Sequence, residues 1–275
     1  MLKSPIFVIF LFCILSAGCG KKEKVYINGF ILRDVAPLYV NYYREVYVHN
    51  KNGFPIVPIC QINDTSLTIA DYHYDYYLFS DNKRFDINKK YELNLQHRGG
   101  KAQGEVFMPG EFSILQPDTS YILKKDSVLK IFWSKANGAT WYWLDIYIDY
   151  WYEDTLGEEE EYESQPDTII YDTFVIYEKN RFFPPYVDSI TEGETGIINV
   201  WACNGPTFLP GSQGNIFGAG YGILMTANQP GEREFNCGIH AKNKKPNEHT
   251  NKKLTSLTNQ MRTDPFTTSS VHFLR

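Results

Sequence analysis

The sequence lacks most signatures by which enzymes and nucleic-acid-binding proteins are recognised. It contains neither Gly-x-Ser-x-Gly nor His-Glu-x-x-His, and its 6 histidines are scattered along 275 residues. No long basic stripe is present and the formal net charge is −5, which argues against nucleic acid as a partner. Helical periodicity is nearly absent as well. These absences predict a chain that is not an enzyme and that needs no cofactor.

Cysteine is scarce, with 5 residues in the whole chain. Cys13 and Cys19 lie near the N-terminus, which leaves Cys60, Cys203 and Cys237 for a folded part. This set contains no Cys-x-x-Cys pair, so a zinc site is not expected. One disulfide, best formed between Cys203 and Cys237, and single buried thiols are both compatible with the sequence.

Long apolar runs are also missing. The longest, from Ile6 to Leu15, is too short to cross a bilayer, which takes about 20 residues, but it suits the central region of a secretory signal. The segment Leu15-Ser16-Ala17-Gly18-Cys19, at the end of this run, resembles the lipobox of bacterial lipoproteins. The resemblance implies removal of residues 1–18, a lipid such as palmitate on Cys19, a tether at residues 19–24, and anchoring to the bacterial cell envelope, at the outer rather than the inner membrane. An ordinary cleaved signal and a buried apolar N-terminus are the alternatives.

Aromatic residues, in contrast, are abundant, with 20 Tyr, 18 Phe and 5 Trp. Turn-forming residues recur between short apolar runs, a combination that favours strands over helices. The chain after residue 18 is long enough for two sandwich-sized domains of about 100 residues each. We therefore expect an all-β protein with β-sandwiches at residues 25–111 and 112–237, and a polar, disordered tail at residues 238–275.

The first stretch carries short alternating runs separated by turn signals. Val46 and Val48 precede a turn at Asn52-Gly53, and Pro55-Ile56 follow it. A later run, Tyr91-Glu92-Leu93, alternates between two faces. These residues resemble the immunoglobulin-like or carboxypeptidase-regulatory-like sandwiches of envelope lipoproteins. The resemblance implies an immunoglobulin-like β-sandwich at residues 25–111.

The second stretch contains two blocks that resemble strands of one family. Leu129–Trp133 and Tyr142-Trp143-Leu144 resemble strands B and C of a fibronectin type III domain, and Ile198–Gly205 resembles its strand F. The resemblance implies a fibronectin type III-like sandwich at residues 112–237. The interval between the blocks is longer than usual, and the excess lies at Glu153–Glu163, an acidic insertion, and at Asn180–Glu194.

Two strands of this stretch alternate with the period of a half-buried sheet. Leu129, Ile131 and Trp133 share one face, so Trp133 is expected to anchor the core. The inward face of the next strand consists of Tyr142, Leu144, Ile146 and Ile148.

The other face of that second strand is the expected binding surface. Large aromatic and acidic side chains alternate there, and strand F, which lies beside strand C in the family, adds another tryptophan. The candidate binding residues are Trp141, Trp143, Asp145, Tyr147, Asp149, Trp151 and Trp201. Such a face could stack sugar rings or dock a protein through aromatic anchors. Alternatively, the N-terminal domain or the acidic insertion covers it, and the aromatics form an interdomain core.

Two further groups of polar residues are weighed as metal sites. Asp71, His73 and Asp75 would share one face of an extended strand, with Tyr72, Tyr74 and Tyr76 packed inward. Successive same-face residues lie about 6.6 Å apart, so one ion cannot readily bind all three. The acidic insertion lacks the spaced carboxylates of a calcium loop. We therefore expect no metal.

Together these features predict an envelope lipoprotein that is anchored through its lipid and acts as a binding, adhesion or scaffolding module without catalysis. The expected partners are the membrane and an envelope protein or glycan, and not nucleic acid. A carbohydrate-binding accessory lipoprotein that uses the aromatic face is the alternative, followed by a glycan hydrolase. An exposed aromatic platform would favour glycan binding, and a pocket with convergent polar groups would favour an enzyme.

Overall fold

The structure is a computed structural model that describes residues 24–36, 38–124, 127–154, 156–178, 181–183, 187–193 and 195–237. Within these ranges the protein is all-β, as predicted, and contains no helix. Accordingly, the described chain offers no helix that is long and apolar enough to span a membrane. The expected signal peptide, Cys19, the tether apart from Lys24 and the expected tail lie outside these residues.

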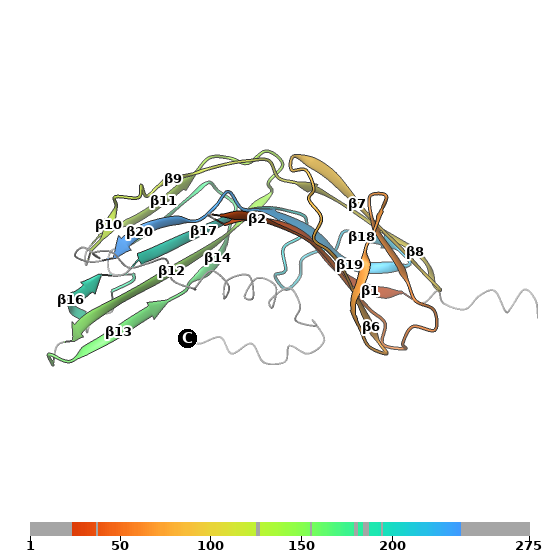
Figure 1. Cartoon of the computed structure of the whole chain (residues 1–275), viewed down its shortest axis with the longest axis horizontal. Helices are drawn as coiled ribbons and strands as arrows, with labels where there is room; N and C mark the ends of the chain where they lie inside the picture. Colours follow the sequence, from red (N-terminus) through yellow and green to blue (C-terminus); the bar gives the residue numbers. More distant parts are fainter. Residues whose placement is uncertain are drawn as a thin grey trace, which may run out of the picture.

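The described strands form an arch in which two β-sandwiches share one large sheet (Figure 1). This shared sheet contains 12 strands and runs along the concave side of the arch. A 5-stranded sheet packs against one half of the shared sheet, and a 3-stranded sheet packs against the other half. We call the opposite side of the shared sheet, which faces away from both of these sheets, the concave face.

The first sandwich encloses a core of alternating apolar residues. For example, Val46 and Val48 of one sheet and Leu93 and Leu95 of the other are fully buried in one cluster. Its strands in the shared sheet are β1 (Val25–Ala36), β2 (Tyr39–His49), β5 (Thr68–Tyr72), β6 (Tyr76–Asp81) and β19 (Gly220–Asn228). Its second sheet has the order β18-β8-β7-β3-β4, with β3 (Ile59–Ile62), β4 (Thr65–Ser66), β7 (Lys89–His97), β8 (Gly100–Met108) and β18 (Ile216–Gly218).

The second sandwich is built in the same way around its own core. The 3-stranded sheet contains β9 (Ile114–Gln116), β11 (Leu129–Trp133) and β15 (Phe174–Tyr177). The strands on the shared sheet are β10 (Ile122–Leu123), β12 (Trp141–Asp154), β13 (Glu159–Ser164), β14 (Asp167–Ile170), β16 (Val187–Gly193), β17 (Thr195–Asn204) and β20 (Arg233–Cys237).

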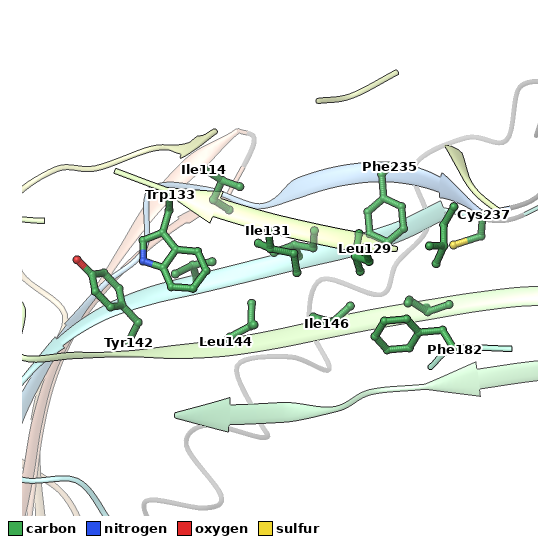
Figure 2. Packing of buried hydrophobic residues seen from close by; sticks show 14 of the residues in the cluster. Ile114, Leu129, Ile131, Trp133, Tyr142, Leu144, Ile146, Phe182, Phe235 and Cys237 are labelled. Carbon is green, nitrogen blue, oxygen red and sulfur yellow. The ribbon is translucent and has the colours of Figure 1, made fainter. Parts of the chain in front are cut away.

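The core of the second sandwich confirms the predicted alternation. Leu129, Ile131 and Trp133 of β11 face Leu144 and Ile146 of β12 (Figure 2). The Trp133 ring is 2% exposed and lies 5.4 Å from the ring of Tyr142, centroid to centroid, in an edge-on contact. Trp133 is therefore the predicted core anchor.

The strand order supports the resemblance of this sandwich to a fibronectin type III domain. The strand expected as C, β12, pairs with the strand expected as F, β17, so that Trp143 lies directly opposite Trp201. The strand expected as B, β11, lies between β9 and β15 in the other sheet.

β19 joins the two sandwiches within the shared sheet. β19 pairs in parallel with β1 from Val25 to Arg33 and, at its end, antiparallel with β17. β20 then continues along the start of β17. The expected boundary near residue 111 therefore does not separate the two cores, because Ile216 and Leu224 pack in the core of the first sandwich. These two residues belong to β18 and β19, which follow β17 in the sequence but pair with β8 and β1, far earlier in the chain.

A glycine within β19 makes this pairing sterically feasible. Gly222 has a φ of +131° and lies against β1 so closely that a Cβ atom would meet the carbonyl oxygen of Ile27. Only glycine adopts this backbone conformation without strain. The Gly-rich segment that contains Gly218, Gly220 and Gly222 therefore includes the contact between β19 and β1.

The excess residues of the second stretch form an extension of the sandwich. The far half of β12 pairs with β13 on one side and with β16 on the other. Its inner side is packed, since Tyr150 is fully buried and donates a hydrogen bond of 2.7 Å from its hydroxyl to the carbonyl oxygen of Phe182. The acidic insertion is thus largely a strand of the sheet rather than a solvated loop.

Candidate functional site

The candidate residues lie on the concave face of β12 and β17. Across these strands Trp143 lies opposite Trp201, and Asp145 lies opposite Asn199. Alternation along β12 places Tyr147, Asp149 and Trp151 on the same side. The structure therefore brings the seven residues to one face, but it places them in three different environments.

The first environment is a buried apolar cluster. Trp141, Trp143 and Trp201 are 2%, 6% and 5% exposed. They share this cluster with side chains of β1 and β19, and the ring of Phe208 lies 4.7 Å from that of Trp143, centroid to centroid. The other buried members are Phe30, Leu32, Cys203, Met225 and Ala227.

This burial decides between the two interpretations for the three tryptophans. A ring that is almost fully covered cannot stack on a sugar, so these residues do not form the exposed platform that glycan binding would need. The three tryptophans agree with the alternative in which this face is covered. The covering side chains come from β1, β19 and the segment around Phe208, and not from the acidic insertion. Their burial stabilises the junction between the two sandwiches.

The second environment is a buried polar network around Asp145, which is 4% exposed. Its carboxylate accepts hydrogen bonds from the side-chain amides of Gln165, at 3.2 Å, and Asn199, at 3.3 Å. The oxygen of the Asn199 amide accepts a third bond, of 2.8 Å, from Gln229, whose backbone N–H donates to the carbonyl of Arg33 on β1. Asp145 therefore links strands of the junction and is not available to a ligand.

The third environment is partly open to solvent. Tyr147, Asp149 and Trp151 are half-buried, and the exposed Glu163 and Glu161 of β13 lie opposite Asp149 and Trp151. We call these five residues the acidic wing. It lies at the end of the arch farthest from the first sandwich (Figure 1).

The electrostatics of the acidic wing are unfavourable within the chain itself. Two carboxylates directly opposite each other in a sheet, as Asp149 and Glu163 are, repel and destabilise the pair. Burial, and then the negative charges of Asp149 and Glu163, raise the pKa of Tyr147, whose hydroxyl lies 3.4 Å from Asp149 Oδ2. Among the described residues, no lysine or arginine forms an ion pair with Glu161 or Glu163. The acidic wing therefore suits a cationic ligand.

The residues weighed as a metal site lie on the hairpin between β5 and β6. His73 Nδ1 lies 3.1 Å from Asp75 Oδ1, and this hydrogen bond is the main reason why the pKa of Asp75 is lowered. Asp71 instead accepts a bond from the hydroxyl of Tyr76. In the described part of the chain no group of ligating side chains could hold a metal ion.

The inward packing expected for the neighbouring tyrosines is wrong. Tyr72 and Tyr74 are 69% and 70% exposed. A tight turn, in which the backbone N–H of His73 donates to the carbonyl of Tyr76, interrupts the alternation that the prediction assumed. A strand pattern read across a turn assigns side chains to the wrong faces.

The three cysteines of the described chain form no disulfide and are buried. Cys60, Cys203 and Cys237 belong to three different apolar clusters, which keeps them apart. Burial raises the pKa values of the Cys60 and Cys203 thiols. A thiol with a raised pKa is a poor nucleophile, so these side chains serve packing.

The sequence did not reveal one further polar surface, on the outer side of the 5-stranded sheet. Ser66, Gln61, Asn94, Gln103 and Phe217 lie opposite one another in a row across all 5 strands. We call these residues the amide row. No local pattern marks it, because its members come from five strands and meet only through their register.

Comparisons with known proteins place the chain in no family. No family model matches the sequence, and no curated protein matches it. Among solved structures, the fibronectin(III)-like modules of CbhA from Clostridium thermocellum match with 10% identity and a TM-score of 0.26, over 80% of this chain and 100% of that chain.

Proposed function

We propose that this protein is a bacterial envelope lipoprotein, anchored through Cys19, that acts as a non-catalytic binding module. Its acidic wing would hold a partner that presents lysine or arginine side chains. The observation that carries the proposal is the pairing of Asp149 with Glu163 beside two half-buried aromatic rings. Two carboxylates held directly opposite each other form a surface that a cationic ligand would stabilise.

The chemistry of the acidic wing matches a basic protein segment. Carboxylates bind lysine and arginine heads, while Trp151 and Tyr147 offer ring faces and edges to the same cations. Charge complementarity of this kind also accelerates association. The aliphatic stems of lysine and arginine could pack on Trp151 in the same contact. A basic protein segment is therefore a better match than a neutral glycan at this surface.

The position of the acidic wing also supports a scaffolding or adhesion role. It lies at one end of the arch, and the shared sheet connects it to the first sandwich, where the chain enters at β1 (Figure 1). A lipid anchor at Cys19 would leave the acidic wing at the far end from the membrane tether. Such a geometry presents a binding surface away from the lipid.

A charge-reversal variant tests the proposal in cells of the source organism. A photoreactive p-benzoylphenylalanine in place of Tyr147 should give a discrete cross-linked adduct with a partner protein upon illumination. Reversing the two exposed carboxylates, Glu161→Lys with Glu163→Lys, should reduce the adduct about tenfold or more, because two charged contacts are lost and two repulsions appear. The yield is measured by immunoblotting.

A matched control separates this effect from a change in overall charge. Asp172→Lys with Glu178→Lys makes the same change in net charge at exposed positions of the same sandwich. The adduct should persist in this variant. Equal loss in both variants, or an adduct that survives reversal at the acidic wing, would show that the acidic wing does not recognise a cationic partner.

A further inference from the structure

The amide row has an unusual composition for a solvent-facing sheet surface. Three neighbouring strands contribute Gln61, Asn94 and Gln103 in direct register, where β-branched or aromatic side chains are usual. Asparagine in the middle of a strand is unfavourable for the strand itself. These residues therefore have a reason other than strand stability.

The side chains of the amide row are held in place by hydrogen bonds to one another. Gln61 Nε2 donates to Ser66 Oγ at 3.2 Å, and Gln103 Nε2 donates to Asn94 Oδ1 at 2.9 Å. Each amide can make more bonds than this. Within the described chain, the Asn94 amide nitrogen and the oxygens of Gln61 and Gln103 make no hydrogen bond to protein. Donors and acceptors therefore alternate along the row and face solvent.

The surface beside the amide row is hollowed rather than flat. A depression of about 380 Å³ lies over Gln61 and Asn94, with Gln96, Lys101 and Ile59 at its sides. At the other end of the row, Phe217 exposes 67% of its surface. Strands in a sheet lie about 4.8 Å apart, so the row spans about 19 Å from Ser66 to Phe217.

We propose that the amide row binds an uncharged saccharide chain that lies across the strands, with one sugar ring stacked on Phe217. Every sugar hydroxyl can both donate and accept a hydrogen bond. The amide row offers the matching groups, because its remaining acceptor oxygens and donor nitrogen alternate across the strands. The C–H face of a pyranose ring is apolar and matches an exposed aromatic ring. The site goes beyond the proposed partner of the acidic wing, since it lies on the other sandwich and on the opposite side of the sheet layers.

Other ligand classes match this surface less well. A phosphate-bearing ligand needs several cations, and Lys101 is the one cation that lines the depression. A protein interface has an apolar centre, whereas the centre of this row is amides. A neutral, polyhydroxylated chain is the ligand whose chemistry the whole row satisfies.

The experiment uses the full-length protein in detergent and a panel of soluble hexasaccharides as probes. The panel contains β-1,4-linked glucose, mannose, xylose and N-acetylglucosamine, and α-1,4-linked glucose. Isothermal titration calorimetry should detect saturable binding of at least one of them. The double variant Asn94→Thr with Gln103→Thr should weaken that binding about tenfold or more, because threonine cannot replace the lost amide bonds. Phe217→Ser should weaken it as well.

Two measurements keep the result unambiguous. Asn41→Thr, a half-buried asparagine on a strand of the same sandwich, is the matched control and should bind like the wild type. Threonine favours strands, so the melting temperatures of the threonine variants should not fall. Failure of every hexasaccharide to bind at millimolar concentration, or equal binding by the double variant and the wild type, would overturn the saccharide site. Neither result would affect the acidic wing, whose variants are on the other sandwich.

Discussion

The double variant Trp143→Ala with Trp201→Ala is expected to lose most of the stability of the protein. The two rings lie directly opposite each other on β12 and β17 and are almost fully buried. Truncating one buried tryptophan to alanine costs about 3–5 kcal/mol, and a whole domain is stable by only about 5–15 kcal/mol. The loss should therefore be visible as a large fall in the midpoint of denaturant unfolding.

The loss should also extend to the first sandwich. The cluster that holds the two tryptophans includes Phe30 and Leu32 of β1 and Met225 of β19. Hydrogen exchange of the backbone amides of Val46 and Leu93, in the core of the first sandwich, should therefore become faster. This measurement distinguishes a shared junction from two independent domains.

Phe132→Ala is the control for this experiment. Phe132 is a half-buried aromatic residue of β11 whose ring lies 5.8 Å from that of Phe174, centroid to centroid. Its loss should cost clearly less and should leave exchange at Val46 unchanged. Wild-type stability in the tryptophan variant, or unchanged exchange in the first sandwich, would contradict a junction held together by these rings.

Replacing Cys19 with alanine is expected to abolish lipid attachment completely. Cleavage after Gly18 would make Cys19 the new N-terminus, and the proposed lipid would be attached to the thiol of this residue. Each buried methylene of an acyl chain contributes about 0.8 kcal/mol to membrane binding, so two or more chains give a stable anchor and their loss releases the protein. Labelling of growing cells with an alkyne-bearing palmitate, followed by membrane fractionation, measures both effects.

Cys13→Ala provides the matched control for the anchor. Cys13 lies in the apolar run that would be removed with the signal. Its replacement should leave labelling and membrane association as they are in the wild type. Persistent labelling of the Cys19→Ala variant, or equal loss in both variants, would refute the assignment of Cys19.

The alternation of apolar residues was sufficient to predict much of the second sandwich. Leu129, Ile131 and Trp133 point into one core because a strand has a period of two and the run contains no interruption. The same rule placed Trp143 and Tyr147 on one face correctly. It could not say which of them is covered, since alternation describes a single strand and contains no information about what packs on it.

The covering residues could not be predicted because they lie far away in the sequence. Phe30 belongs to β1, and Met225 belongs to a strand that pairs in parallel with β1 across the junction. Parallel pairing of such distant segments leaves no local pattern. The Gly-rich segment around Gly222 was the single visible trace, and glycine is more often a sign of a turn than of a close approach between strands.

The strand pairing of the acidic insertion could not be predicted for a related physical reason. Glutamates in a run normally repel one another and stay solvated, so no local pattern indicates that Glu161 and Glu163 lie in a sheet. Pairing with β12 overrides that preference, because the inner side of the extension buries Tyr150 and Tyr162 together. The apolar side chains on the inner side therefore hold β12 and β13 together, although carboxylates on the outer side of the same two strands repel each other.

We propose that one face of β12 is structural at Trp143 and functional at Trp151. The most direct test is the Trp151→Ala variant, carrying the photoreactive residue in place of Tyr147, with adduct yield and free energy of unfolding measured on the same protein. Trp151 is only half-buried, so we expect the adduct to be lost while the protein loses much less stability than the several kcal/mol expected for Trp143→Ala. An undiminished adduct, or destabilisation as large as that of Trp143→Ala, would contradict it.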